Sequence, residues 1–378
     1  MQRKIKILVD LSFIRTDNHY AGVSKYAYRF LNYLIEIGET ENVVLLLNVL
    51  SEKQIREWYP QFKYQTIGNI RYRKMKGIRT WSLTATFRKT VKNSGCDIVF
   101  CPYGSDINSV KIDVPKITVI HDIQLQIDSK GFQRWYHKII DDFTVKYTDK
   151  IITISEYAEE QIHSVYPHAE IVNFSNCVEI TPCQTPPILS FPYILYVGRM
   201  CKMKGCNTLV KAFVKMASKK PEFKLVMIGY DEKYWHQVLE PVIRKAHMEE
   251  RVITIKQCTE LEIANYYAHA KLFVFPSLRE GFGTPPVEAA MHKIPVISSM
   301  VDSLEEVSMG MFYTYGNATD DKSLADKIVE VLNTPPSKER LENICLTMAE
   351  TYSIERVGGK ILNLIYKTPV GGINLAHI

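Results

Sequence analysis

Short runs of apolar, often β-branched residues recur along the chain and alternate with longer stretches whose apolar positions follow the helical period. The first run is Ile5–Val9, and a helical pattern follows from about Val23 to Ile37. Such alternation is typical of a parallel sheet that helices cover on both faces. The later runs in the first half are 43–48, 97–101, 117–120 and 150–154, and the helical patterns among them include 132–148 and 156–165.

A proline-rich segment interrupts this alternation. Residues 181–192 (TPCQTPPILSFP) hold four prolines, which remove backbone donors and restrain their neighbours, so the segment predicts a linker. The alternation then resumes, and we expect an α/β protein with two doubly wound parallel-sheet domains, 1–185 and 190–352. In the second domain the predicted strands are 193–197, 224–228, 252–255, 272–275 and 295–297, and the predicted helices are 205–219, 232–247, 259–269, 284–292, 320–333 and 336–351.

Composition agrees with two ordinary globular domains. The chain has 378 residues, 46% apolar and 23% charged, which excludes collagen-like, largely disordered and disulfide-scaffold classes. Its eight cysteines include no CxxC pair, so we expect reduced thiols in a cytoplasm rather than a zinc ribbon or a thioredoxin-type site. Asp10 interrupts the first apolar run, so we expect no signal peptide, and we expect no membrane-spanning segment either.

Positive charge is concentrated in residues 53–92. This segment holds eleven Lys and Arg against a single acid, Glu57, and aromatic residues interleave with the cations. Such a segment suits anionic lipid head groups, and the alternative is a solvated face that acids elsewhere balance. Because no nucleic-acid-binding motif accompanies it, we expect no nucleic-acid partner.

Two motifs of the second half carry candidate chemistry. In the first, a predicted strand ends at Val197 and a helix begins near Gly205, with the sequence GRMCKMKG between 198 and 205. Glycine lets a ligand approach the backbone, helix-start N–H groups favour an anion, and Arg199 and Lys204 would bind phosphate oxygens. The alternative is an ordinary strand-to-helix turn with two solvated cations, and the spacing is not that of a Walker A loop.

The second motif is FPSLREGFGTPPVEAA at 275–290, in which a predicted strand runs into a glycine-containing turn and a helix. Glu280 precedes the turn and Glu288 lies about one turn inside the helix, so both carboxylates could accept hydrogen bonds from sugar hydroxyls. Taken alone, two such glutamates could equally cap a helix or be solvated.

Together these motifs resemble those of the retaining glycosyltransferases of the GT-B fold, family 4 type, also called group 1. The resemblance runs from the first strand to about Ile365, and its most specific segment is 272–298. It implies a catalytic role for Arg199, Lys204, Glu280 and His121, the last within VIHD at the end of a predicted strand. It implies a donor-binding role for Gly198, Gly281, Phe282, Gly283, Thr284 and Glu288.

On the acceptor side, the resemblance points to the loop and helix start at Gly22, with Lys25 or Tyr26 approaching the acceptor. It also implies that a helix at about 353–366 packs back onto the first domain, and that both sheets face one cleft. A pair of acids in the first half, Asp141 and Asp142, falls in a helical pattern, and we expect a solvated face there rather than a metal site.

The resemblance therefore predicts a metal-independent hexosyltransferase without a cofactor. The donor would be a UDP- or GDP-sugar and the acceptor a glycan or lipid-linked hydroxyl, in surface polysaccharide or glycolipid assembly. We expect a cytoplasmic protein, either free or peripheral on the inner face of an anionic membrane through residues 53–92. The alternatives are a nucleotide-sugar epimerase or a phosphorylase on the same fold, and a non-catalytic nucleotide-sugar-binding protein.

Overall fold

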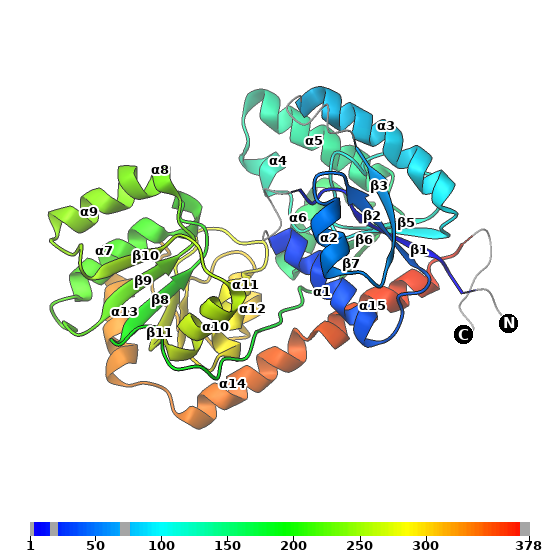
Figure 1. Ribbon diagram of the computed structural model, residues 1–378. Coiled ribbons are helices and arrows are strands. Elements are labelled where there is room, and N and C mark those ends of the chain that lie inside the picture. Colours follow the sequence, from blue (N-terminus) through cyan, green and yellow to red (C-terminus); the bar gives the residue numbers. More distant parts are fainter. Residues whose placement is uncertain (1–3, 16–21, 69–75, 371–378) are drawn as a thin grey trace. The chain divides into compact units, whose positions relative to one another are not determined.

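The computed structural model describes residues 4–15, 22–68 and 76–370 (Figure 1). The chain divides into two units, each with its own sheet. Unit 1 comprises Met1–Cys177 and Ile354–Ile378, and unit 2 comprises Val178–Ser353. No helix of the described residues is long and apolar enough to cross a bilayer.

Unit 1 is built on a seven-stranded parallel sheet in the order β3-β2-β1-β4-β5-β6-β7. Its strands are β1 Ile7–Leu11, β2 Val43–Asn48, β3 Lys63–Ile67, β4 Ile98–Cys101, β5 Lys116–Val119, β6 Lys150–Thr153 and β7 Ile171–Asn173. Its helices are α1 Gly22–Glu36, α2 Glu52–Trp58, α3 Lys76–Ser94, α4 Gln124–Asp128, α5 Gly131–Lys146, α6 Glu156–Val165 and α15 Ile354–Lys367.

Unit 2 has a five-stranded parallel sheet in the order β10-β9-β8-β11-β12. Its strands are β8 Tyr193–Val197, β9 Lys224–Ile228, β10 Val252–Ile255, β11 Leu272–Phe275 and β12 Val296–Ser298. Its α-helices are α7 Cys206–Met216, α8 Glu232–Tyr234, α9 Glu240–Lys245, α10 Glu260–His269, α11 Thr284–Met291, α12 Leu304–Ser308, α13 Asp321–Asn333 and α14 Lys338–Thr351.

The two doubly wound sheets confirm the predicted fold class. The structure differs from the prediction in two edge strands and in one interrupted helix. Strands β3 and β7 escaped prediction because each forms an edge of its sheet and is only partly buried, so neither forms a fully apolar run. The single helix predicted over 232–247 is broken by a π turn at Trp235–Leu239. Pro241, just after this turn, has no N–H to donate to the preceding turn.

The proline-rich segment 181–192 contains no helix or strand, as predicted. It packs on α10, where the Asn265 amide nitrogen lies 2.8 Å from both the Thr185 hydroxyl and the Pro186 carbonyl, and the amide oxygen accepts from the Ile188 N–H at 3.0 Å. Residues 178–185, assigned to the first domain on sequence alone, therefore lie with unit 2.

Helix α15 belongs to unit 1, although α14, which precedes it, belongs to unit 2. It packs against α1, where a Cβ added to Gly358 would lie 2.6 Å from the Tyr33 ring. At its end, the Tyr366 hydroxyl donates to the Glu39 carboxylate at 3.3 Å. Glycine at 358 is what allows the two helices to approach this closely.

The expectation that Asp141 and Asp142 form a solvated face of α5 is confirmed for Asp142, whose side chain is 40% exposed, and is wrong for Asp141. Burial raises the pKa of Asp141 to about 7, and Asp142 accepts a hydrogen bond from Tyr166 at 2.8 Å in addition to its ion pair with Lys138. Thr144, three positions after Asp141, is the buried residue of α5, so this side of the helix faces the protein.

Candidate functional site

Two glycines bring together the loops that follow β8 and β9. Gly198, at the end of β8, has φ 153° and donates to the Ile228 carbonyl at 3.0 Å. Gly229, just after β9, has φ 106°, and a Cβ there would lie 2.4 Å from the Gly198 carbonyl oxygen. Both positions require glycine, but only Gly198 stands out in the sequence, because Gly229 belongs to no recognised motif.

A third glycine ties the GRMCKMKG loop to the loop after β11. Gly205 has φ 65°, and a Cβ there would lie 1.8 Å from the Pro276 carbonyl oxygen. Nearby, the Met203 carbonyl accepts from the Leu278 N–H at 2.7 Å and lies 3.2 Å from the Ser277 hydroxyl. The sheet order places these loops side by side, because β8 is the direct neighbour of β11.

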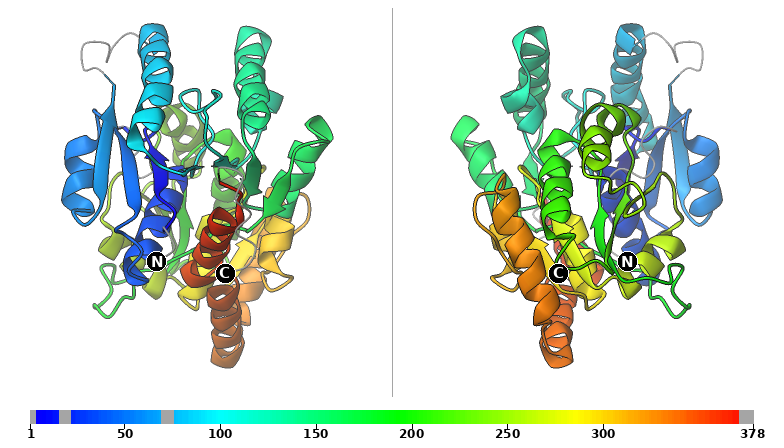
Figure 2. Two further views of the ribbon diagram at one scale, coloured as in Figure 1. Left: turned by 90° about the vertical axis from the view of Figure 1, so that its right-hand side faces the viewer. Right: turned by 90° about the vertical axis from the view of Figure 1, so that its left-hand side faces the viewer.

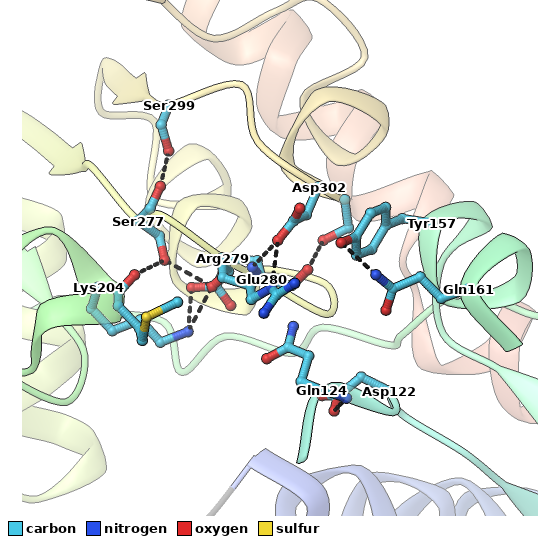
Figure 3. A network of polar contacts seen from close by, with 12 residues as sticks. Asp122, Gln124, Tyr157, Gln161, Lys204, Ser277, Arg279, Glu280, Ser299 and Asp302 are labelled. Carbon is cyan, nitrogen blue, oxygen red and sulfur yellow. Dashed lines mark hydrogen bonds and ion pairs between the residues drawn. The ribbon is translucent and has the colours of Figure 1, made fainter. Parts of the chain in front are cut away.

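Lys204 and Glu280, predicted separately from the two motifs, form an ion pair (Figure 3). Lys204 Nζ lies 2.5 Å from Glu280 Oε1, and the two side chains are 24% and 10% exposed. The Glu280 N–H donates to Asp302 Oδ2 at 3.0 Å, and its carbonyl accepts from the Ser303 hydroxyl at 3.1 Å. Asp302 and Ser303, which follow β12, hold the backbone of Glu280 and were missed because they lie outside both motifs.

The turn before α11 has its own steric requirement. Gly283 has φ 91°, and a Cβ there would lie 2.3 Å from the Leu304 side chain. Thr284 begins α11 and prolines follow at 285 and 286, so those two positions offer no N–H to an anion. Backbone donation at this helix start therefore comes from the turn residues, Thr284 or Val287, and not from the two prolines.

The side chains of Phe282 and Glu288 each contact a buried tyrosine. The Phe282 ring is buried and meets the Tyr352 ring edge-on, with the ring centroids 5.2 Å apart, so this side chain packs in the interior and offers no surface to a ligand. Glu288, on α11, accepts a hydrogen bond from the Tyr267 hydroxyl at 3.1 Å, and Tyr267 is itself buried. Arg199 is exposed, and its carbonyl accepts from the Tyr196 hydroxyl at 3.1 Å.

In unit 1, His121 follows β5 and is buried. Its Nε2 lies 3.0 Å from the Pro102 carbonyl, which can only accept, so Nε2 carries the proton. Burial lowers the pKa of His121, although the Pro102 contact and Asp122 oppose that shift. The neutral ring therefore keeps Nδ1 as a hydrogen-bond acceptor.

The acceptor-side residues of the prediction lie on α1, which begins at Gly22. The Tyr26 ring is 1% exposed and meets the His121 ring edge-on at 5.1 Å, and its buried hydroxyl has no hydrogen-bond partner among the described residues. Lys25 is half-buried and Gly22 is exposed. The structure thus brings Tyr26 and His121 together at the carboxyl ends of the strands of unit 1.

A buried polar cluster supports this end of unit 1 and was not predicted. Asp10, the fourth residue of β1, accepts from the Ser12 N–H and from the Asn108 amide, both at 2.9 Å. Lys116 Nζ donates to the carbonyls of Asn108 at 2.7 Å and Val110 at 2.9 Å. Burial raises the pKa of Asp10 and lowers that of Lys116. We interpret the hydrogen bonds of these two side chains as holding the loop after β4 in place.

Comparison with known families identifies unit 2. Residues 179–344, which contain both motifs and the Lys204–Glu280 pair, match the family described as glycosyl transferases group 1. The match spans nearly all of unit 2, so unit 2 is a group 1 glycosyl transferase domain. Among relatives of this glycosyl transferase is O-antigen chain mannosyltransferase B of Escherichia coli, 25% identical over 266 residues that cover 65% of this chain and 69% of that protein.

Solved structures of low sequence identity share the fold of this glycosyl transferase along nearly its whole length. Sucrose-phosphate synthase from Thermosynechococcus elongatus has a TM-score of 0.77 at 17% identity, covering 96% of this chain and 98% of that one. Anabaena HepE in complex with UDP and glucose has a TM-score of 0.76 at 14% identity, covering 96% and 99%. The chain therefore has the GT-B fold, as its motifs predicted.

Proposed function

We propose that this glycosyltransferase moves a hexose from a UDP- or GDP-sugar to a hydroxyl of a glycan or lipid-linked acceptor, with retention of the anomeric configuration, in surface polysaccharide assembly. One observation carries the proposal: Lys204 and Glu280, 76 positions apart, pair at the loops that follow β8 and β11. Its setting is supported by a relative that is an O-antigen mannosyltransferase and by a structural neighbour that holds UDP and glucose.

The donor diphosphate is proposed to bind at the GRMCKMKG loop. Lys204 has three N–H donors, so it can keep its bond to Glu280 while it donates to a phosphate oxygen. Arg199 is exposed and offers its planar fork to the same diphosphate. As the sugar leaves, negative charge grows on the diphosphate, and these two cations stabilise it without a metal ion.

The hydroxyls of the donor are proposed to meet the two glutamates. Glu280 would accept from the transferred sugar, since Asp302 and Lys204 fix its position. Glu288, oriented by the Tyr267 hydroxyl, would accept from the ribose hydroxyls of the nucleotide. The backbone of Gly281, Phe282, Gly283 and Thr284 would face the sugar and the phosphates.

In unit 1, we propose that His121 Nδ1 accepts a hydrogen bond from a sugar hydroxyl, because Nε2 is committed to Pro102. The acceptor would bind near Gly22, Lys25 and Tyr26. Its hydroxyl attacks the anomeric carbon from the face of the leaving group, the bond to the diphosphate oxygen breaks, and that diphosphate takes the hydroxyl proton. The enzyme would act in the cytoplasm at the inner face of a membrane.

A donor panel tests the proposal. Thermal unfolding is measured with UDP-glucose, UDP-galactose, GDP-mannose and ADP-glucose, and we expect a UDP- or GDP-sugar to raise the melting temperature, since a ligand that binds only the native state stabilises it. Glu288→Ala should abolish that shift, and Glu249→Ala, an exposed acid far along the chain from both motifs, is the control.

Product analysis separates the alternatives. Transfer of labelled sugar to an acceptor glycan supports the proposal. Conversion of the donor alone to an epimer, or phosphate-dependent cleavage of a glycan, would assign one of the other enzyme classes. Donor binding without turnover on any glycan or lipid-linked acceptor would make the chain a binding protein.

A further inference from the structure

Helix α5 turns an apolar, aromatic face to solvent. Phe132 is 74% exposed and Trp135 57%, and their ring centroids lie 5.5 Å apart. Tyr136 follows about one turn after Phe132 and Phe143 about three turns after it, and both are also exposed. Positions 132, 135, 136 and 143 fall on one side of a helix with 3.6 residues per turn, so these side chains form a continuous strip, which we call the α5 face.

The opposite side of α5 is the one that meets unit 1. Thr144 is buried, and Val145 packs against the apolar cluster that contains Ile120 and Ile151. Asp141 lies on this inner side, where burial raises its pKa to about 7. An ordinary surface helix has the reverse arrangement, so the exposure of the Phe132 and Trp135 rings has no explanation within unit 1.

Positive charge accompanies the α5 face. Lys146, fourteen positions after Phe132, is exposed on the same side of α5, and Lys130 and Arg134 are exposed at the start of the helix, on its other side. Helix α3 lies beside this end of unit 1: its Thr84 hydroxyl donates to the Asp106 carbonyl, and the Tyr136 hydroxyl donates to the Asp106 carboxylate, both at 3.1 Å. Figures 1 and 2 show the two helices projecting at the same end of the sheet.

Two cations of α3 lie on the side of that helix that contacts Asp106. Thr84, Arg88 and Lys92 are spaced four residues apart, so they share one side of the helix, the side that contacts Asp106. Arg88 and Lys92 are both exposed, and Arg88 Nε donates to the Lys111 carbonyl at 2.9 Å. The aromatic strip therefore has a basic border on the next helix.

We propose that the α5 face docks on an anionic phospholipid surface, with Phe132 and Trp135 inserted at the head-group level and the cations of α3 and α5 against the phosphates. Aromatic residues flanked by Lys and Arg are the side chains that favour this interface. A second copy of the chain fits less well, because two-fold pairing would set this basic border against itself. The proposal rests on the proposed function only in that a lipid-linked acceptor would bring the enzyme to such a surface.

Vesicle co-sedimentation of the full chain tests this surface. Vesicles of phosphatidylcholine alone are compared with vesicles that also contain phosphatidylglycerol. We expect binding to the anionic vesicles that weakens as salt is raised, and we expect the double variant Phe132→Ser/Trp135→Ser to lower the partition coefficient at least about tenfold. Leu261→Ser on α10 of unit 2, where the side chain is 70% exposed, is the matched control and should bind like the wild type.

Trp135 also supplies a direct signal, since its emission should shift to the blue on anionic vesicles and this change should vanish in Trp135→Phe. Equal binding of wild type and double variant, or equally poor binding to both vesicle types, would overturn the proposal. A wild-type dimer in sedimentation velocity that the double variant converts to monomer would assign the α5 face to self-association instead. The double variant should show the same thermal shift with the donor as the wild type. If the wild type binds lipid but no nucleotide sugar, the proposed function is refuted and the lipid-docking proposal is not.

Discussion

Among the glycines of unit 2, Gly205 leaves the least room for an added side chain, which gives a sharp test of how the two loops of the candidate site are joined. Gly205→Ala places a methyl group 1.8 Å from the Pro276 carbonyl oxygen, at a residue whose φ is 65°. Gly310→Ala is the matched control, because Gly310 has φ 70° and nothing lies within 4 Å of its added Cβ. The two variants share the cost of a left-handed alanine, and only the first adds a collision.

The magnitude follows from the contacts. A left-handed alanine costs about 1–2 kcal/mol at either site. At Gly205 the Pro276 carbonyl must also move away, which disturbs the bonds of Ser277 and Leu278 to Met203, each contributing about 1 kcal/mol. We therefore expect about 3–4 kcal/mol for Gly205→Ala, or a melting temperature lower by roughly 6–16 °C for a unit of this size.

Thermal unfolding of both variants, with and without a nucleotide sugar, measures these effects. Gly310→Ala should lose only a few degrees and keep the full donor shift. Gly205→Ala should unfold much earlier and lose the donor shift, because its loop carries Lys204 and Arg199. If both variants unfold at the same temperature, the loops after β8 and β11 are not held together by this close approach.

Further expectations follow from the charged and titratable groups. Lys204→Met should lower kcat at least about 100-fold, since it removes a cation from the leaving group, whereas the exposed Lys202→Met should stay within about twofold in the same transfer assay. Burial lowers the pKa of His121, so the neutral ring stabilises the fold fully above about pH 6.5, and this stabilisation is lost as the pH falls below that value. Between pH 7 and pH 5, His121→Asn should therefore lose less stability than the wild type. Because the pKa of Asp141 is raised to about 7, ionisation of its carboxyl group destabilises the fold increasingly as the pH rises from about 4 to 7. The melting temperature of Asp141→Asn should therefore be higher than that of the wild type at pH 8 and equal to it at pH 4. An unchanged melting temperature for that variant at pH 8 would mean that Asp141 is solvated.

The sequence by itself determined the fold class and the local setting of both motifs. Central strands such as β8 and β11 are buried on both faces, so they appear as unbroken apolar runs whose ends can be predicted. The motif residues follow those runs directly, which places them at strand ends without knowledge of the rest. The helical pattern at 156–165 likewise begins where α6 begins, just after Ser155, whose hydroxyl accepts from the Ala158 N–H at 3.1 Å.

Only the tertiary structure decided which of these positions meet. Lys204 reaches Glu280 because β8 and β11 are adjacent in the sheet, and Asp302 supports Glu280 because β12 is next to β11. Strand order depends on the packing of the whole unit, which no local pattern encodes. The orientation of α5 has the same origin: periodicity shows that one side of the helix is aromatic and the other polar, but the protein packed against it determines which side faces water, and here Phe132 does while Asp141 does not.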